Sequence, residues 1–183
     1  MPATLLPTKL TIPPPRPDRV ARTRLTDALS AGIHRKLTIV SAPAGFGKST
    51  LVADWLVART GPAAWISLDE GDGDVASFLA YIVAAFRPFT GRADELLEMA
   101  GSPGSPPVAI LTSLIGDVGR IGERVVLVLD DYHRVDSTAV DEALQFLVDH
   151  LPEQLRLIIT TREDPQIGLS RLRAKDNLSE IRA

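Results

Sequence analysis

The chain contains 183 residues, of which 45% are apolar and 23% are charged, and its formal net charge is −3. This balance is typical of one globular domain with its own core, and it excludes disorder over the whole length. The absence of cysteine excludes a disulfide scaffold, a thiolate zinc site and a cysteine nucleophile. The acidic balance gives no overall basic footprint for nucleic acid.

No apolar run is long enough to predict a transmembrane helix. The first residues also lack the basic region and apolar stretch of a secretory signal. We therefore expect a cytoplasmic protein that, through this chain alone, contacts neither membrane nor nucleic acid.

Residues 1–20 are predicted to form a proline-rich extended arm. Six of the 14 prolines lie within the first 17 residues, and each fixes φ and lacks an N–H donor. Apolar side chains at positions 5, 6, 10 and 12 indicate that the arm packs on the remaining domain, residues 21–183.

Helical and strand-like segments then alternate along the chain. In order, the apolar patterns predict a helix over 22–30, a strand over 37–41, a helix over 48–59, a strand over 64–68, helices over 75–86, 94–99 and 107–118, a strand over 125–129, a helix over 139–150, and strands over 155–160 and 178–182. Asp74 is the expected N-cap of the helix after it, and Thr138 with Asp141 resembles a capping box. The alternation predicts an α/β fold in which helices cover both faces of a parallel sheet.

The segment between the first strand and the second helix has the pattern of a phosphate-binding loop. It runs Ala42-Pro43-Ala44-Gly45-Phe46-Gly47-Lys48-Ser49-Thr50 and departs from the strict Walker A pattern only at Ala42, where glycine is usual. The glycines let the backbone curl so that its N–H groups, together with the helix N-terminus, surround phosphate oxygens. The predicted nucleotide-binding residues of this loop are Ala44, Gly45, Phe46, Gly47, Lys48, Ser49 and Thr50.

Three of these loop residues have distinct expected roles. Lys48 is expected to reach the β- and γ-phosphates, and Ser49 to give its hydroxyl to Mg²⁺. Thr50 lies one residue further into the same array of donors.

Two acids follow the apolar strand at 125–129, as in a Walker B motif. Asp130 is expected to hold Mg²⁺ through water, and Asp131 to orient or deprotonate the attacking water. A second interpretation of Asp131 stays open, because an acid at this position can simply cap the next turn.

Further polar residues follow other strands at the same edge, where ligands of open α/β sheets bind. Arg162 is a candidate sensor of the γ-phosphate, and the alternative is a surface arginine paired with Glu163 or Asp164. Asp69 and Glu70 are better interpreted as part of a solvated loop than as metal ligands. The histidines, His34, His133 and His150, show no metal spacing and are interpreted as structural or surface residues.

Several stretches together carry a family resemblance: 6–10, 16–17, 20–25, 36–50, 65–70, 129–133 and 161–165. They resemble the MalT-like, ATP-dependent LuxR-family regulators, which belong to the STAND class of signal-transducing ATPases. Ala42 is usual in that family. The resemblance implies a three-layer P-loop NTPase with a mostly parallel five-stranded sheet of order 5-1-4-3-2. It also implies that Val20 and Arg22 contact the adenine, and that Arg162 is the sensor.

The same resemblance implies a nucleotide switch, with ADP held at rest and ATP in an active oligomer after an inducer binds. Members continue into a winged-helix region, a repeat-built sensor and a C-terminal helix-turn-helix. We therefore expect this chain to be the nucleotide-binding domain alone, with self-association through it in the full-length family.

The leading hypothesis is a domain that binds ATP or ADP with Mg²⁺ and hydrolyses ATP slowly. A small-molecule phosphotransferase with the same loop is the alternative, but it needs a lid that carries arginines, and residues 101–107 contain none. An interaction module that has lost its nucleotide is disfavoured by the intact Lys48, Ser49 and Asp130.

Overall fold

The computed structural model describes residues 4–18 and 20–182, so residues 1–3 and 19 of the predicted arm and residue 183 lie outside the described residues. Its centre is one five-stranded sheet of order β2-β3-β4-β1-β5, and every pairing in it is parallel. The strands are β1 (Leu37–Ser41), β2 (Ala63–Ser67), β3 (Val125–Asp130), β4 (Leu155–Thr161) and β5 (Leu178–Arg182). The predicted fold class and strand order are confirmed.

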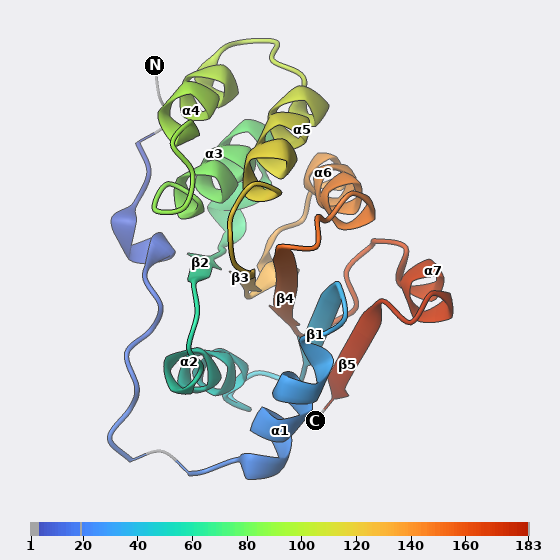
Figure 1. The fold of residues 1–183 in the computed structure, drawn as a ribbon. Coiled ribbons are helices and arrows are strands. Elements are labelled where there is room, and N and C mark those ends of the chain that lie inside the picture. The colour runs from blue at the N-terminus through green and yellow to red at the C-terminus, as the bar shows by residue number, and fades with distance from the viewer. Residues whose placement is uncertain (1–3, 19, 183) are drawn as a thin grey trace.

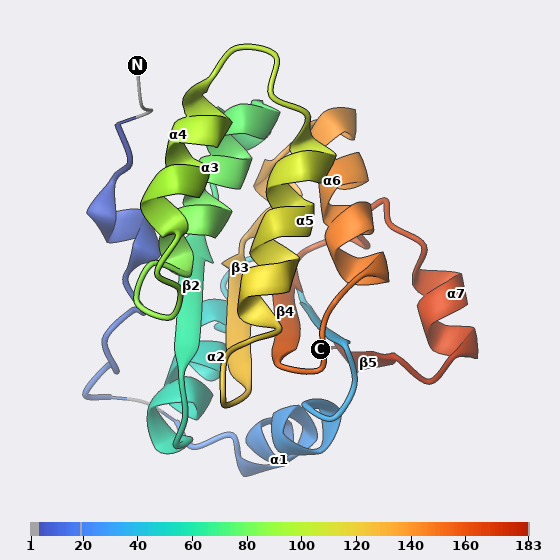
Figure 2. The ribbon, with the colours of Figure 1, turned by 45° about the horizontal axis from the view of Figure 1, so that its top comes forward.

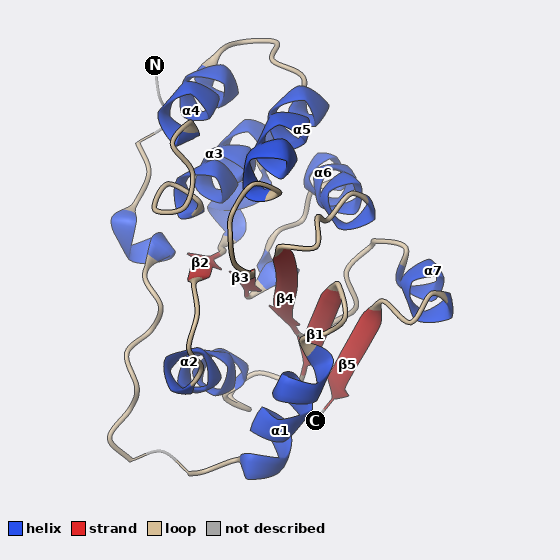
Figure 3. Ribbon diagram, in the orientation of Figure 1, coloured by secondary structure: helices blue, strands red, loops and turns tan. Residues whose placement is uncertain are grey.

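Helices cover both faces of this sheet (Figure 1). The helices are α1 (Thr23–Gly32), α2 (Lys48–Ala58), α3 (Val75–Ala85), α4 (Ala93–Gly101), α5 (Pro107–Val118), α6 (Thr138–Asp149) and α7 (Leu169–Ala174). The first two lie on one face and α3 to α6 on the other, with the strands as a single layer between them (Figure 3). In the described part of the chain, none of the helices combines the length and apolarity that a membrane crossing requires.

The alternation of side chains along β3 divides the core into two apolar clusters. Val125, Leu127 and Leu129 face α3, α5 and α6, whereas Val126 and Val128 face α1 and α2. All five are fully buried. A strand that is apolar on both faces suits a parallel sheet with helices on each side, because no face of it meets water.

The predicted helices begin and end within two residues of the observed ones, but one predicted cap is wrong and one helix was missed. The Asp74 side chain caps α3 by accepting a hydrogen bond from the Ser77 N–H at 2.8 Å, as expected. The predicted cap at Thr138 is wrong, because Ser137 caps α6 and Asp141 instead accepts a 2.6 Å hydrogen bond from the Tyr132 hydroxyl. The six-residue helix α7 was not predicted, since it is too short to show a helical period.

The arm passes along the outer side of β2 before it reaches α1 (Figure 2). A single 3-10 turn, η1 (Pro7–Leu10), interrupts its extended backbone. Lys9 on this turn forms ion pairs of 2.8 Å with Asp69 and with the buried Asp72. The backbone N–H of Leu6 also donates to the Tyr81 hydroxyl of α3 at 3.1 Å. These contacts attach the arm to α3 and to the segment between β2 and α3.

Candidate nucleotide-binding site

The predicted phosphate loop connects β1 directly to α2. Gly45 has a φ of +79° and Gly47 a φ of +70°, a region that residues with a side chain rarely adopt. Gly47 is the N-cap residue of α2. A β-carbon at this position would lie 3.2 Å from the Arg22 guanidinium, so both backbone conformation and space favour glycine there.

Lys48, the first residue of α2, folds back over its own loop. Its Nζ donates to the carbonyl oxygens of Ala42 at 2.9 Å and Pro43 at 3.2 Å, and the residue is only 7% exposed. The ammonium group therefore lies against the loop that the glycines shape, where a phosphate chain on the N-terminus of α2 would meet it.

Ser49 and Asp130 come from different elements and meet at hydrogen-bonding distance. The Ser49 Oγ donates to Asp130 Oδ1 at 2.7 Å, and the Thr160 Oγ1 donates to the same oxygen at 2.6 Å. Asp130 is 6% exposed. Burial raises the pKa of the Asp130 carboxyl, and the two hydroxyl hydrogen bonds oppose that rise.

This pair has the donor chemistry that Mg²⁺ prefers, one hydroxyl and one carboxylate, with other positions left for water and phosphate oxygens. Among the described residues, no group of three or more His, Cys, Asp or Glu side chains could hold a metal ion by itself. The residues present thus fit a magnesium ion that arrives with a nucleotide.

Asp131 and Arg162 lie at the same edge of the sheet. Asp131 has a left-handed φ of +58° and begins the 3-10 turn η3 (Tyr132–Arg134), and its N–H donates to Thr160 Oγ1 at 2.9 Å. Arg162 is exposed and, within the described part of the chain, forms no salt bridge. Asp164, one of the partners considered for it, pairs with Arg182 at 2.9 Å.

His133, interpreted above as a structural or surface residue, also belongs to this group of charged residues. Burial lowers the pKa of its imidazole; the carboxylate of Asp131 opposes this effect, and the charges of Arg162 and Lys48 add to it. Its Nδ1 is buried and, among the described residues, has no hydrogen-bond partner. Its position two residues after Asp131 could have indicated from the sequence that it lies at this edge of the sheet.

A pocket of about 490 Å³ adjoins the loop on the side of the arm. Arg22 fixes the arm there, since its Nη1 donates to the Phe46 carbonyl oxygen. Val20 lines the pocket and is 81% exposed. The other lining residues come from the arm, α1, the loop and α2: Arg16, Asp18, Ala21, Thr23, Thr26, Gly45, Gly47, Thr50, Leu51, Asp54, Trp55 and Ala58.

The structure thus separates the predicted site residues into two adjoining groups. Lys48, Ser49 and Asp130 lie together around the start of α2. Val20, Arg22 and Thr50 line the pocket beside it. Asp69 lies in neither group, because it pairs with Lys9.

Comparison with known proteins agrees with this geometry. Residues 20–160 match the AAA ATPase domain family. The HTH-type transcriptional regulator MalT of Cronobacter sakazakii is 33% identical over 180 residues, which are 97% of this chain and 20% of that regulator. The chain therefore spans about a fifth of the length of this curated relative.

Two solved structures share the fold. One is a signal transduction ATPase with numerous domains (STAND), with a tetratricopeptide repeat sensor, from Pyrococcus horikoshii. Its TM-score is 0.64 at 18% identity, over 93% of this chain and 24% of that one. The other is Drosophila ORC bound to AT-rich DNA and Cdc6, with a TM-score of 0.52 at 12% identity, over 86% of this chain and 50% of that one.

Family membership implies nucleotide binding, and the Walker A and Walker B residues are where such a domain requires them. The chain belongs to the AAA ATPase domain family, and its sequence is similar to the matching fifth of the regulator MalT.

Proposed function

We propose that this domain binds ATP and ADP with Mg²⁺ and acts as the nucleotide switch of a signal-responsive, LuxR-type transcriptional regulator. The observation that carries the proposal is the 2.7 Å contact between Ser49 and Asp130, which come from the P-loop helix and from β3. A hydroxyl and a carboxylate that meet beside the start of the P-loop helix suit a cation bound to phosphates.

Each residue would have a separate task. The ammonium of Lys48 binds the β- and γ-phosphates as a point charge, and the N–H groups of residues 44–50 surround the phosphate oxygens. Bound Mg²⁺ would neutralise charge on those phosphates, with Ser49 and Asp130 as its protein ligands. The pocket beneath Val20 and Arg22 would take the base and ribose.

Slow hydrolysis follows from the remaining residues. Asp131 is half-buried at the same edge and would orient the attacking water, and Arg162 would contact the γ-phosphate. Arg162 is exposed and unpaired within the described residues, so it is free to take a phosphate as partner. Hydrolysis therefore requires the bound nucleotide to position Arg162, and we expect it to be slow.

The direct test is the nucleotide content of freshly purified protein, measured by chromatography after denaturation. Calorimetric titration of Mg-ATP and Mg-ADP into protein from which bound nucleotide has been removed then gives the affinities. We expect bound ADP, and micromolar affinity for Mg-ATP and Mg-ADP, which corresponds to about 8 kcal/mol of binding free energy. Absence of nucleotide and of any heat of binding in folded protein contradicts the proposal. Phosphoryl transfer to an acceptor other than water would support a phosphotransferase instead.

A further inference from the structure

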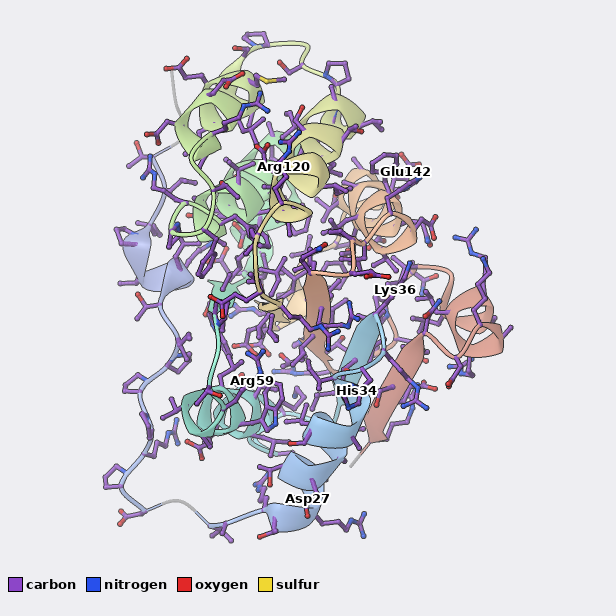
Figure 4. The ribbon with its side chains drawn as sticks, in the orientation of Figure 1. Asp27, His34, Lys36, Arg59, Arg120 and Glu142 are labelled. Atoms are coloured by element: carbon purple, nitrogen blue, oxygen red, sulfur yellow. The ribbon has the colours of Figure 1, made fainter. Side chains whose placement is uncertain are left out.

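Three arginines gather at the edge of the sheet opposite the nucleotide site. Arg59 is the C-cap residue of α2, Arg124 immediately precedes β3, and Arg156 is the second residue of β4. They come together because β2, β3 and β4 are neighbours. Ala63, four residues after Arg59, pairs with Val126, and Val126 pairs with Arg156. Figure 4 labels Arg59 beside α2 and Lys36 near the start of β1.

These arginines are close enough to repel one another. The charge of Arg124 lowers the pKa of both Arg59 and Arg156, in addition to the effect of burial, which is larger. Glu123 acts in the opposite direction on Arg59, and Glu153 on Arg156. Within the described residues, neither glutamate forms a salt bridge with any of the three arginines. The positive charge of the cluster is therefore only partly neutralised by the protein.

The hydrogen bonds of the cluster go to backbone carbonyl groups. Arg156 Nη1 donates to the carbonyl oxygens of Leu155 at 2.8 Å and Glu153 at 3.0 Å, whereas its Nε is buried without a partner in the described structure. Arg59 Nη1 donates to the Pro62 carbonyl at 3.4 Å, and its guanidinium lies over the Trp55 ring. The half-buried arginines are therefore held in place while part of their donor capacity remains unused.

We propose that Arg59, Arg124 and Arg156 form a binding site for an acidic segment of a partner protein, whose carboxylates they recognise. Guanidinium groups bind carboxylates in a planar, bidentate geometry, and pre-ordered arginines lose little entropy when they do so. Arg124 and Arg156 lie at the opposite edge from the phosphate loop, because five to six residues of strand, roughly 17–20 Å, lie between the two edges. Arg59 is closer to the nucleotide site, since its neighbour Ala58 and the Trp55 ring beneath it also line the pocket beside the loop.

The charge of the whole chain favours a short acidic peptide over nucleic acid. A net charge of −3 repels an extended polyanion at long range, whereas a short segment responds to charges within a Debye length of about 10 Å. Trp55, whose ring lies against the Arg59 guanidinium, is only 5% exposed and offers no platform on which bases could stack.

The test is fluorescence anisotropy with a fluorescein-labelled hexaglutamate peptide, added to the intact chain at low salt. We expect saturable binding that weakens by about tenfold or more in Arg124→Glu, which reverses the exposed charge of the cluster. Arg124→Lys keeps the charge but loses the bidentate geometry, and should weaken binding by about threefold. Lys175→Glu, before β5, makes the same charge change elsewhere on this edge and should alter affinity by less than about twofold.

Circular dichroism and Mg-nucleotide affinity should be unchanged in all three variants, which separates this site from the proposed switch. Equal weakening in Arg124→Glu and Lys175→Glu would reduce the cluster to general surface charge and overturn the proposal. So would the absence of saturable binding to folded protein, or tighter binding of a single-stranded oligonucleotide of equal charge.

Discussion

Charged residues at the two edges of the sheet differ in their burial and in their neighbours. At the carboxyl ends of the strands, Lys48 and Asp130 are almost fully buried; Lys48 bonds to two carbonyl oxygens of its own loop, and Asp130 accepts hydrogen bonds from two hydroxyls of other elements. At the amino ends, Arg59 and Arg156 also bond to carbonyl oxygens, but they are half-buried and lie beside a third arginine. One edge is prepared for a polyphosphate and a cation, and the other retains uncompensated positive charge. Buried charge thus indicates a site most clearly when its partners inside the protein are counted.

Lys48→Ala should produce the largest effect at the carboxyl edge. It removes the ammonium group that faces the phosphates, so nucleotide affinity should fall by about 100-fold or more. Isothermal titration calorimetry with Mg-ADP measures the loss. Lys36→Ala, at the amino end of β1, is the matched control and should bind as the unmodified chain does. Undiminished binding by Lys48→Ala would disprove the assignment of the loop.

Asp130→Asn should remove the magnesium dependence of binding. The amide retains an acceptor for the hydroxyls of Ser49 and Thr160 but lacks the charge that a metal ion requires. In the unmodified chain, we expect Mg²⁺ to strengthen ATP binding by about tenfold, and in the variant by less than about twofold. Titrations with and without a chelator supply both values, and an undiminished response to Mg²⁺ in the variant contradicts the metal assignment.

Arg22→Ala should weaken nucleotide binding by about threefold to tenfold. The substitution releases the arm from the Phe46 carbonyl and leaves the pocket beside the loop less closed. Arg24→Ala is a suitable control, because Arg24 is exposed close by and does not line that pocket. Equal affinities in the two variants would show that the arm does not contribute to the base pocket.

His133→Asn should flatten the dependence of stability on pH. Because the pKa of His133 is lower in the folded protein than its usual value of 6.5, the unfolded chain binds more protons below about pH 6.5. This residue therefore makes the unmodified protein less stable as pH falls through that value, until the folded imidazole itself is protonated. Urea unfolding from pH 7 to pH 5 should show a smaller decline for the variant, and an equal decline would contradict this expectation.

Arg124→Ser should have the smallest effect, and it should stabilise the protein. It removes the charge that repels Arg59 and Arg156, so the melting temperature should rise by about 1 °C at low salt and by less at high salt. Differential scanning calorimetry at two salt concentrations measures this difference. A fall in melting temperature would show that Arg124 stabilises the edge.

Local patterns predicted the regular elements well and the contacts between distant residues poorly. The helix over 107–118 was predicted with its observed bounds, because Pro107 starts it and its apolar spacing is regular. The strand order came from the family resemblance, since apolar strands do not specify their neighbours. The Lys9–Asp72 ion pair joins residues 63 positions apart, and no local pattern marks it.

In the candidate site, too, contiguous motifs could be predicted from the sequence, and contacts between distant residues could not. The P-loop is contiguous, so Lys48 and Ser49 could be assigned from the sequence, and their geometry supports that assignment. The place of His133 depends on the turn after Asp131, whose left-handed backbone redirects the chain. The arginine cluster takes Arg59 and Arg124 from two connections and Arg156 from β4, so it becomes visible only when the sheet is assembled.

The attachment of η1 has a consequence for the behaviour of shortened chains. β2 is an outermost strand of the sheet, and η1 lies against it, with Lys9 held by Asp69 and Asp72. Outermost strands with unpaired backbone groups attract strands of other molecules. A version of this protein that starts after the proline-rich stretch would uncover that strand, so it should self-associate into aggregates during concentration even if its phosphate loop were intact.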